Sequence, residues 1–287
     1  MPGALLAVPN VSEGRDLDAV AAIAAAFDAR LLATHTDPDH HRSVFTLAGE
    51  PGRLAGSVLA GAREVLARVD LRRHDGLHPR VGAIDVAPIV YLLASDRGGA
   101  CAEALVLADR LGDELELPVF LYGLLAGGRT RAALRRGGPA ELSRRMAIGE
   151  LRPDFGPPEL HPSAGAVLVA ARPPLVAFNV ELAPGASLED ARAIAASIRE
   201  GGAEGLTGVR AIGLWLDHAG VAQVSTNVED HRATPLAEVV AAVRRRVPVG
   251  DAELVGLAPR AAFDAFPEDV AVRGMRVLED LLPAPNS

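Results

Sequence analysis

The order of apolar and polar positions gives the second half of the chain a simple succession of predicted elements. One helix is marked by Ser187 as its N-cap, acidic residues in its first turn and glycines after its end. Two strand-like runs are joined by His-Ala-Gly, a short connection typical of a hairpin. The predicted elements are strand 173–182, helix 187–202, strands 209–217 and 221–230, helix 235–247 opened by Thr234-Pro235, and strand 252–258. The order β-α-β-β-α-β is that of a split βαβ, or ferredoxin-like, fold.

The first half shows the same order with additions. Its predicted elements are strand 4–10, helix 16–29, strands 30–36 and 42–49, helix 51–69 and strand 82–92, followed by a helix near 101–111, a strand at 117–123 and an arginine-rich helix before residue 152. We therefore predict an α+β fold of two internally duplicated ferredoxin-like sandwich subdomains, 1–172 and 173–287, with a cleft between them where ligands bind. The alternative is that alternating elements match by coincidence.

Composition supports a globular protein and narrows its class. Apolar residues make up 49% of the 287 positions, charged residues 23% and aromatic residues 3%, and the chain contains no lysine. A net charge of −8 argues against nucleic-acid binding, and the apolar runs are too interrupted for a membrane span. The single cysteine, Cys101, lies in an apolar helix and is expected in the core. With no disulfide possible and no basic start of a secretory signal, the chain is expected in the cytoplasm.

The stretch LRRHDGLHPRVGAIDVAP, residues 71–88, carries the clearest candidate chemistry. His74 and His78 have the i, i+4 spacing of two ligands on a helix, but Gly76 and Pro79 disfavour a helix there. A second histidine- and aspartate-rich segment offers candidate ligands in an ordinary Asp-Pro-Asp turn, namely His35, Asp37, Asp39, His40 and His41. Neither segment has the ligand spacing of a metal site, so we predict no metal.

A catalytic role for His78 is the other interpretation. A histidine in a loop fixed by glycine and proline can accept and donate a proton near neutral pH. Arg80 could hold a carboxylate in a bidentate grip, while Asp85 could orient the imidazole or pair with that arginine. The plainer alternative is that His78 is a loop residue bonded to the backbone, and residue patterns alone favour it.

Six collinear motifs resemble the formiminotransferase family, the domain of glutamate formimidoyltransferase and of formiminotransferase-cyclodeaminase. They are AVPNVSEGRD, HPRVGAIDVAP, LPVFLYG, RPDFGP, LVAFNVEL and VAQVSTNVED, and they span residues 9–256 approximately. The resemblance implies two ferredoxin-like subdomains and a homodimer. It also implies a reaction, the transfer of a formimino group from N-formimino-L-glutamate to tetrahydrofolate in histidine degradation. Small molecules, rather than nucleic acid or membrane, are the implied partners, and tetrahydrofolate is a co-substrate.

The resemblance also implies roles for particular residues. The family's catalytic histidine falls on His78, and Asn10, Arg42, Arg80 and Asp85 are candidate substrate-binding residues. The family's folate-contacting loop corresponds to Gly156, Pro157, Pro158, Glu159, Leu160, His161, Pro162, Ser163, Ala164 and Gly165. Ala164 stands where the animal enzymes have a tryptophan, so the flat partner of the pterin ring is missing or supplied elsewhere. The turn DPDHHRSV also differs from the family's small-residue version, although Arg42 keeps its place.

Two further hypotheses fit the same motifs. One is a related one-carbon transferase that uses a formyl donor or another formimino-amino acid. The other is a non-catalytic folate-binding homologue, against which the His-Pro-Arg motif argues. Loss of transfer in His78→Ala with folate binding retained would separate catalysis from binding.

Overall fold

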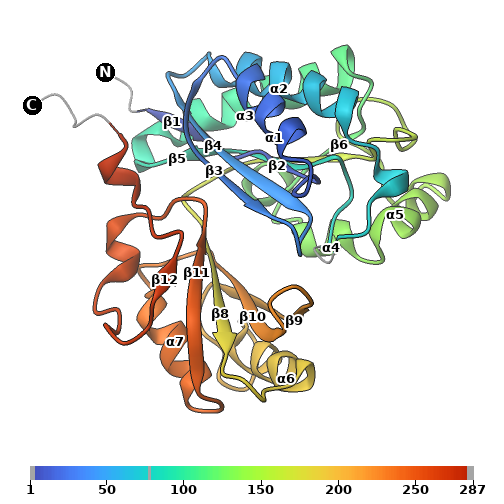
Figure 1. Cartoon of the computed structure of the whole chain (residues 1–287). Coiled ribbons are helices and arrows are strands. Elements are labelled where there is room, and N and C mark those ends of the chain that lie inside the picture. The colour runs from blue at the N-terminus through green and yellow to red at the C-terminus, as the bar shows by residue number, and fades with distance from the viewer. Residues whose placement is uncertain (1–3, 77–78, 283–287) are drawn as a thin grey trace, which may run out of the picture. The chain divides into compact units, whose positions relative to one another are not determined.

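The structure is a computed structural model that describes residues 4–76 and 79–282. Its chain divides into two compact units, Met1–Pro173 and Pro174–Ser287. Each unit combines a sheet with helices, so the fold is mixed α+β with two sheets (Figure 1). Within the described residues, no helix combines the length and hydropathy needed to cross a membrane.

The first unit is built on a seven-stranded sheet. Its elements are β1 (Leu5–Ala7), β2 (Asn10–Val11), α1 (Leu17–Ala26), β3 (Arg30–Asp37), β4 (Arg42–Gly49), α2 (Leu54–Arg68), β5 (Ile84–Tyr91), α3 (Arg97–Glu114), β6 (Val119–Leu121), α4 (Arg131–Arg135), α5 (Gly138–Ala147) and β7 (Val167–Arg172). Across the sheet, β3 pairs with β4, β1 and β2 lie between β4 and β5, and β7 and β6 follow β5. The first strand of the sequence pattern is therefore interrupted, and both of its pieces pair with the same neighbours.

Helices cover the two faces of this sheet unequally. On one face, α1, α2 and α3 pack their apolar residues, such as Ile23, Leu59 and Leu107, against the sheet (Figure 1). On the other face, Leu134 of α4 and Leu142 of α5 pack on a smaller cluster over β5, β6 and β7. Among the described residues, those of β2, β3 and β4 that face the other side belong to neither apolar cluster.

The run 167–172, to which the alternation pattern assigned no element, is β7. It pairs in parallel with both β5 and β6, and five of its six residues are buried. A strand covered on both faces has a continuous apolar run, which lacks the period-two signal of a half-exposed strand. The sequence pattern consequently missed a central strand of the sheet.

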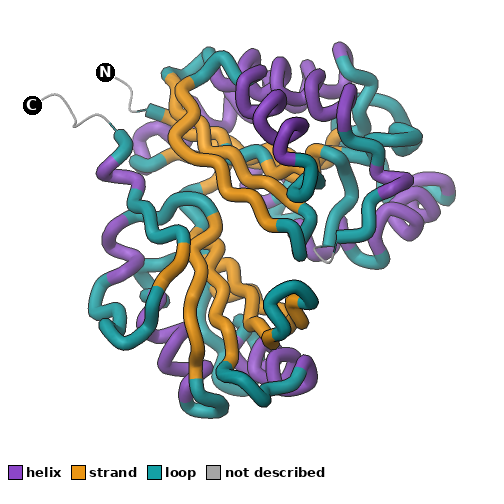
Figure 2. The backbone as a smooth tube through the Cα atoms, in the orientation of Figure 1, coloured by secondary structure: helices purple, strands orange, loops and turns teal. Residues whose placement is uncertain are grey.

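The second unit has a five-stranded sheet in the order β12-β11-β8-β10-β9. Its elements are β8 (Val176–Leu182), α6 (Leu188–Ile198), β9 (Val209–Leu216), β10 (Val221–Val228), α7 (Leu236–Arg244), β11 (Val249–Val255) and β12 (Val272–Arg273). Apolar residues of α6 and α7 pack on alternate residues of the strands, and Figure 2 shows these strands and helices as separate layers. The two-residue β12 joins the edge of β11 and was not predicted.

Local sequence signals explain where the helices of this unit begin. Ser187 caps α6 in a capping box, because its side chain accepts from the Asp190 N–H while the Asp190 carboxylate accepts from the Ser187 N–H. This cap was predicted. The start of α7 has no side-chain cap of this kind, because Pro235 is the N-cap residue. The hydroxyl of the preceding Thr234 donates to the Thr207 carbonyl, at 2.8 Å. The last predicted strand also lies three residues earlier, at β11.

Candidate active site

The candidate catalytic residue, His78, lies outside the described residues. The described chain on either side of residues 77–78 is contacted by His41 in the turn between β3 and β4, by Arg15 before α1 and by Asp85 of β5. These neighbouring residues all belong to the first unit.

Asp85 is the buried carboxylate of this region. It is 1% exposed on β5, accepts a hydrogen bond from the Val81 N–H at 2.8 Å, and forms an ion pair with Arg135 of α4. The sequence analysis considered a pairing of Asp85 with Arg80 or with an imidazole. The structure pairs it with Arg135, fifty residues away, which no local spacing could indicate. Asp85 thus ties the start of β5 to α4.

Arg80 braces the loop on which it lies. Its guanidinium donates to the Gly76 carbonyl at 2.7 Å and to the His74 carbonyl at 2.8 Å. Burial lowers the pKa of Arg80, and the carboxylates of Asp85 and Asp75 oppose that shift. The Arg80 side chain is half-buried, and its two hydrogen bonds hold the loop in place. A substrate carboxylate bound by Arg80 would have to share the guanidinium group with these backbone carbonyls.

His74 stacks on His41, with ring centroids 4.1 Å apart. Its Nδ1 accepts from the Gly76 N–H, so Nε2 carries the hydrogen and donates to the His41 carbonyl at 2.9 Å. Burial lowers the pKa of His74 to about 4, which keeps the ring neutral at pH 7. Both ring nitrogens are engaged, and His74 therefore acts as a loop support with no nitrogen left for a metal ion.

The hairpin between β3 and β4 carries a second polar group. Burial would raise the pKa of Asp37, but hydrogen bonds from the His40 ring, at 2.6 Å, and from the His40 N–H outweigh it and lower the pKa to about 2. Arg42 lies opposite Asp37 in the strand register. The turn that departs from the family's small-residue version is therefore closed by a hydrogen-bonded Asp37–His40 pair.

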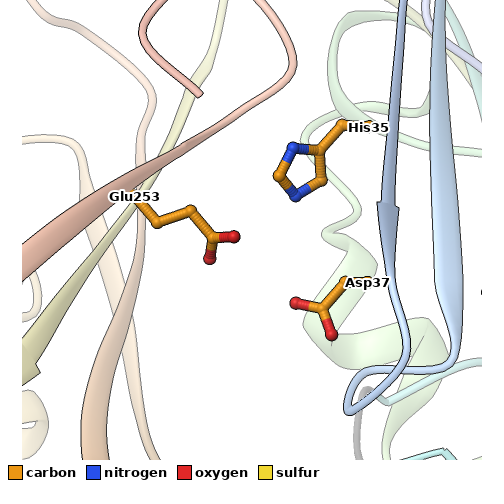
Figure 3. A group of neighbouring side chains, drawn as sticks. All are labelled: His35, Asp37 and Glu253. Atoms are coloured by element: carbon orange, nitrogen blue, oxygen red, sulfur yellow. The ribbon is translucent and has the colours of Figure 1, made fainter. Parts of the chain in front are cut away.

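His35 and Asp37 project from the same face of β3, as residues two apart on a strand do (Figure 3). Two ligands are fewer than the three or four that a zinc site uses, so these two residues alone do not form a metal centre. Figure 3 also labels Glu253, which belongs to β11 of the second unit and accepts a hydrogen bond from the Asn179 side-chain amide at 2.9 Å.

Asn10 shares the sheet face of His35 and Arg42. It pairs with Val44 on β4, which in turn pairs with His35 on β3. Asn10 is 9% exposed, and its amide nitrogen donates to the Val8 carbonyl at 2.9 Å. The register thus gathers three of the predicted polar residues on the face that α1, α2 and α3 leave uncovered.

The candidate folate loop, residues 156–165, ends against the loop that contains His78. The Leu71 N–H donates to the Ser163 carbonyl and the Ala83 N–H to the Ala164 carbonyl, each at 2.8 Å. Gly82 and Gly165 form an isolated bridge, and a Cβ on Gly82 would lie 1.8 Å from the Ala166 carbonyl oxygen. The two segments that the sequence analysis singled out separately are therefore joined on both sides of His78.

Exposure divides the candidate folate loop into a free part and a packed part. Ala164 is 2% exposed and packs in the core that α1, α2 and α3 cover, and Gly165 is buried beside it. His161 Nδ1 accepts from the Ala164 N–H at 3.0 Å and closes the end of the loop. The residues with exposed surface are Gly156, Pro157, Pro158, Glu159, Leu160, His161, Pro162 and Ser163. A ligand can reach this group, whereas the Ala164 methyl group faces the core.

Comparison with known proteins identifies the family. The model of the formiminotransferase domain, N-terminal subdomain, matches residues 4–172, and that of the formiminotransferase domain matches residues 177–267. Glutamate formimidoyltransferase of Thermoplasma acidophilum is 35% identical over 271 residues, covering 89% of this chain and 88% of that protein. The Streptococcus pyogenes serotype M1 protein of the same name is 33% identical over 268 residues, covering 89% of each chain.

A longer relative matches over part of its length. The formimidoyltransferase-cyclodeaminase of Rattus norvegicus is 37% identical over 278 residues, which cover 90% of this chain and 51% of that protein. The chain thus spans about half the length of these bifunctionally named relatives. The two family models together with the relatives matched along nearly their full length show that this chain belongs to the formiminotransferase family.

Proposed function

We propose that the chain transfers the formimino group of N-formimino-L-glutamate to tetrahydrofolate, giving 5-formiminotetrahydrofolate and glutamate, as a step of histidine degradation. The observation that carries this proposal is the match, over nearly nine-tenths of both chains, to two proteins named glutamate formimidoyltransferase. Tetrahydrofolate is the co-substrate. The partners of the chain are these small molecules. The chain forms a homodimer and is located in the cytoplasm.

We also propose that residues 1–172 and 173–287 are two ferredoxin-like subdomains of one duplicated ancestor. In the second unit, the strands of the β-α-β-β-α-β segment lie in the order fourth, first, third, second. In the first unit, the strands β3, β4, β1 with β2, and β5 give the same order read from the other edge. Both units keep their helices α1 and α2, or α6 and α7, on one face of the sheet.

The proposed reaction is an addition followed by an elimination at one carbon. The folate N5 forms a bond to the formimino carbon while its C=N double bond becomes a single bond, which gives a tetrahedral carbon bonded to three nitrogens. The bond from that carbon to the glutamate nitrogen then breaks as the C=N double bond forms again. His78 takes the proton from N5 and returns a proton to the leaving nitrogen, so no net proton or electron is required. Acid–base help of this kind contributes about 10²- to 10⁴-fold to a rate. The scheme uses no metal or redox step.

The contacts of the described residues support two different roles for the predicted binding residues. Arg42 and Asn10 share a sheet face, and we propose that they contact substrate. Arg80 and Asp85 are proposed to hold the loop around His78, because Arg80 donates to its carbonyls and Asp85 accepts its Val81 N–H. The exposed part of the loop 156–163 is proposed to contact folate, and the core position of Ala164 leaves the pterin ring to other residues.

The deciding experiment is a transfer assay with purified protein, tetrahydrofolate and a panel of formimino- and formyl-amino acids, followed by absorbance of the one-carbon folate. We expect formiminoglutamate to be the preferred donor. His78→Ala should lower transfer by at least about a hundredfold while folate binding survives, and the control His218→Ala, in an exposed turn, should retain transfer. Unchanged turnover in His78→Ala would remove His78 from the mechanism. Folate binding without transfer by the unaltered chain would instead support a non-catalytic homologue.

A further inference from the structure

His41, in the turn between β3 and β4, has an uncommon backbone conformation. Its φ is +49°, in the left-handed region that residues with a Cβ rarely adopt. Its side chain is only 12% exposed, and its ring nitrogens face two carboxylates. Nε2 lies 3.2 Å from Glu13 Oε1, and Nδ1 lies 3.4 Å from Asp75 Oδ1. A conformation of this kind persists where the surrounding contacts impose it, and such residues gather at functional sites.

Glu13, in the segment before α1, fixes the edge of the His41 ring. Burial would raise the pKa of Glu13, but hydrogen bonds from the backbone N–H groups of Arg15 and Asp16, together with the nearby His41 ring, outweigh it and lower the pKa. The carboxylate is therefore ionised at pH 7. An ionised carboxylate only accepts hydrogen bonds, so His41 Nε2 is the donor to Glu13.

The face of the His41 ring packs on the loop that precedes residues 77 and 78. It stacks on the His74 ring, with centroids 4.1 Å apart, and the His41 carbonyl accepts from His74 Nε2 at 2.9 Å. Gly76 closes the contact, because a Cβ there would lie 2.5 Å from the His40 carbonyl oxygen and 2.6 Å from His41 Cβ. His41 therefore packs against the last described residue before residues 77 and 78.

An exposed ion pair also joins the turn to this loop. The Arg15 guanidinium donates to the Asp75 carboxylate at 2.5 Å and to the Pro38 carbonyl at 3.1 Å. Asp75 is 73% exposed, so solvent screens this pair and it contributes little to holding the loop. The stack of His41 on His74, between half-buried rings, is therefore the contact that fixes the loop against the turn.

We propose that His41 is a positioning residue for formimino transfer. By stacking on His74 and packing on Gly76, it fixes the backbone of residues 74–76, from which the chain continues to the proposed catalytic His78. Glu13 in turn fixes the orientation of the His41 ring. The inference rests on the proposed function for the reaction that it affects. It gives the turn DPDHHRSV, which differs from the family's small-residue version, a part in that reaction.

His41→Asn tests the proposal, with His218→Asn, in the exposed turn between β9 and β10, as the matched control. Asparagine adopts the left-handed conformation more readily than most residues, so the turn should keep its backbone while the ring is lost. We expect kcat to fall about tenfold or more in His41→Asn, while KM for formiminoglutamate and for tetrahydrofolate changes little. His218→Asn should behave as the unaltered chain, and thermal unfolding checks that both variants are folded. Equal kcat values for the two variants would overturn the inference.

A double-mutant cycle with His78→Ala shows whether His41 acts through His78. If it does, His41→Asn should not lower the residual transfer rate of His78→Ala any further. A fall by the same factor in both backgrounds would show that His41 acts independently of His78, and the proposal would be wrong.

Glu13→Gln is the second variant, and it decides the question if His41→Asn does not fold. Its amide keeps an oxygen that accepts from the Arg15 and Asp16 N–H groups but loses the charge that faces His41. We expect a smaller fall in kcat than in His41→Asn, and no further fall when the two substitutions are combined. An unchanged kcat in Glu13→Gln, with His41→Asn unfolded, would contradict the proposal.

The ring of His74 gives a measurement that does not depend on transfer. Burial lowers the pKa of His74 to about 4, and loss of the stacked His41 ring should expose it and move its pKa towards the usual value of about 6.5. NMR titration follows the His74 Cε1 proton, assigned by its absence in His74→Gln.

The two measurements together separate this inference from the proposed function. A raised His74 pKa in His41→Asn supports the hold of His41 on the loop even if the unaltered chain transfers no formimino group, and only the proposed function then fails. Normal transfer and an unchanged His74 pKa in His41→Asn overturn the inference and leave the proposed function standing. A lower kcat with an unchanged His74 pKa also overturns it, because His41 would then act by another route.

Discussion

At the scale of single residues, Asp37 stabilises the turn that leads into Arg42. Its carboxylate is 16% exposed and accepts from both the ring and the backbone N–H of His40. The pKa falls from 3.8 to about 2, so the ionised form is favoured in the folded chain. A carboxyl group with a lowered folded pKa stabilises the fold above its unfolded pKa, and this contribution disappears as the pH falls from about 4 to about 2.

Asp37→Asn tests this contribution. The variant keeps an oxygen that can accept from the His40 N–H but loses the charge facing the His40 ring. We expect the free energy of unfolding at pH 7 to fall by about 2 kcal/mol, and the difference from the unaltered chain to shrink towards zero near pH 2. Urea unfolding at a series of pH values measures both. A difference that stays constant down to pH 2 would show that charge is not its cause.

The same scale shows what residue patterns can and cannot predict. The sequence placed Arg80 and Asp85 correctly in one region and left their pairing open. The partner that the structure gives Asp85 is Arg135, and only the packing of α4 on the sheet brings the two together. His74 was assigned no role, and its support of the loop depends on stacking with His41, thirty-three residues earlier. Contacts between residues so far apart in the sequence leave no pattern in the local sequence.

At the scale of elements, the approach of two segments at Gly82 and Gly165 shapes the candidate site. Gly165 has a φ of +69°, and an added Cβ there would lie 2.2 Å from the Val81 carbonyl oxygen. Only glycine at both positions lets the end of the loop 156–165 bridge the start of β5. The candidate folate loop and the segment that leads into β5 therefore form one structural unit, although about eighty residues separate them in the sequence.

Gly82→Ala should disrupt that unit. The new methyl group would overlap the Ala166 carbonyl, so we expect a loss of about 2–4 kcal/mol in the free energy of unfolding and a higher KM for tetrahydrofolate. Gly99→Ala is the matched control, because Gly99 is an exposed position of α3 with open space around it and alanine favours a helix by up to about 1 kcal/mol. Thermal unfolding and the transfer assay compare the two. Equal stability of both variants would contradict the close approach.

Elements with a periodic pattern were predicted well, and those without one were not. The amphipathic helices and the half-covered strands of the second unit lie where alternation and capping placed them, to within a few residues. The central strand β7 gave no alternation because both of its faces are buried, and β12 is too short to give any pattern. Whether a strand is buried on both faces depends on how the whole sheet is covered, so a short stretch of sequence cannot predict it.

At the scale of the whole molecule, the absence of lysine makes arginine the only fixed side-chain cation of this 287-residue chain. Reagents that acylate primary amines therefore have no side-chain target, whereas phenylglyoxal, which modifies guanidinium groups, has 29. If arginines bind the substrate carboxylates, acylation should leave transfer intact. Phenylglyoxal should abolish transfer, and excess glutarate should slow that inactivation.

Arg42→Lys turns this composition into a site-specific test, because it gives the chain one lysine at a position proposed to contact the substrate. We expect an acylating reagent to inactivate this variant, since it removes the positive charge of the new amine, and glutarate to protect it. Arg136→Lys, with its single lysine at the exposed position that follows α4, is the control and should remain active after acylation. Mass spectrometry of the acylated peptides confirms that each lysine has reacted. Full activity of acylated Arg42→Lys would exclude a cation at position 42 from substrate binding, because no other side-chain amine in the variant could account for the modification.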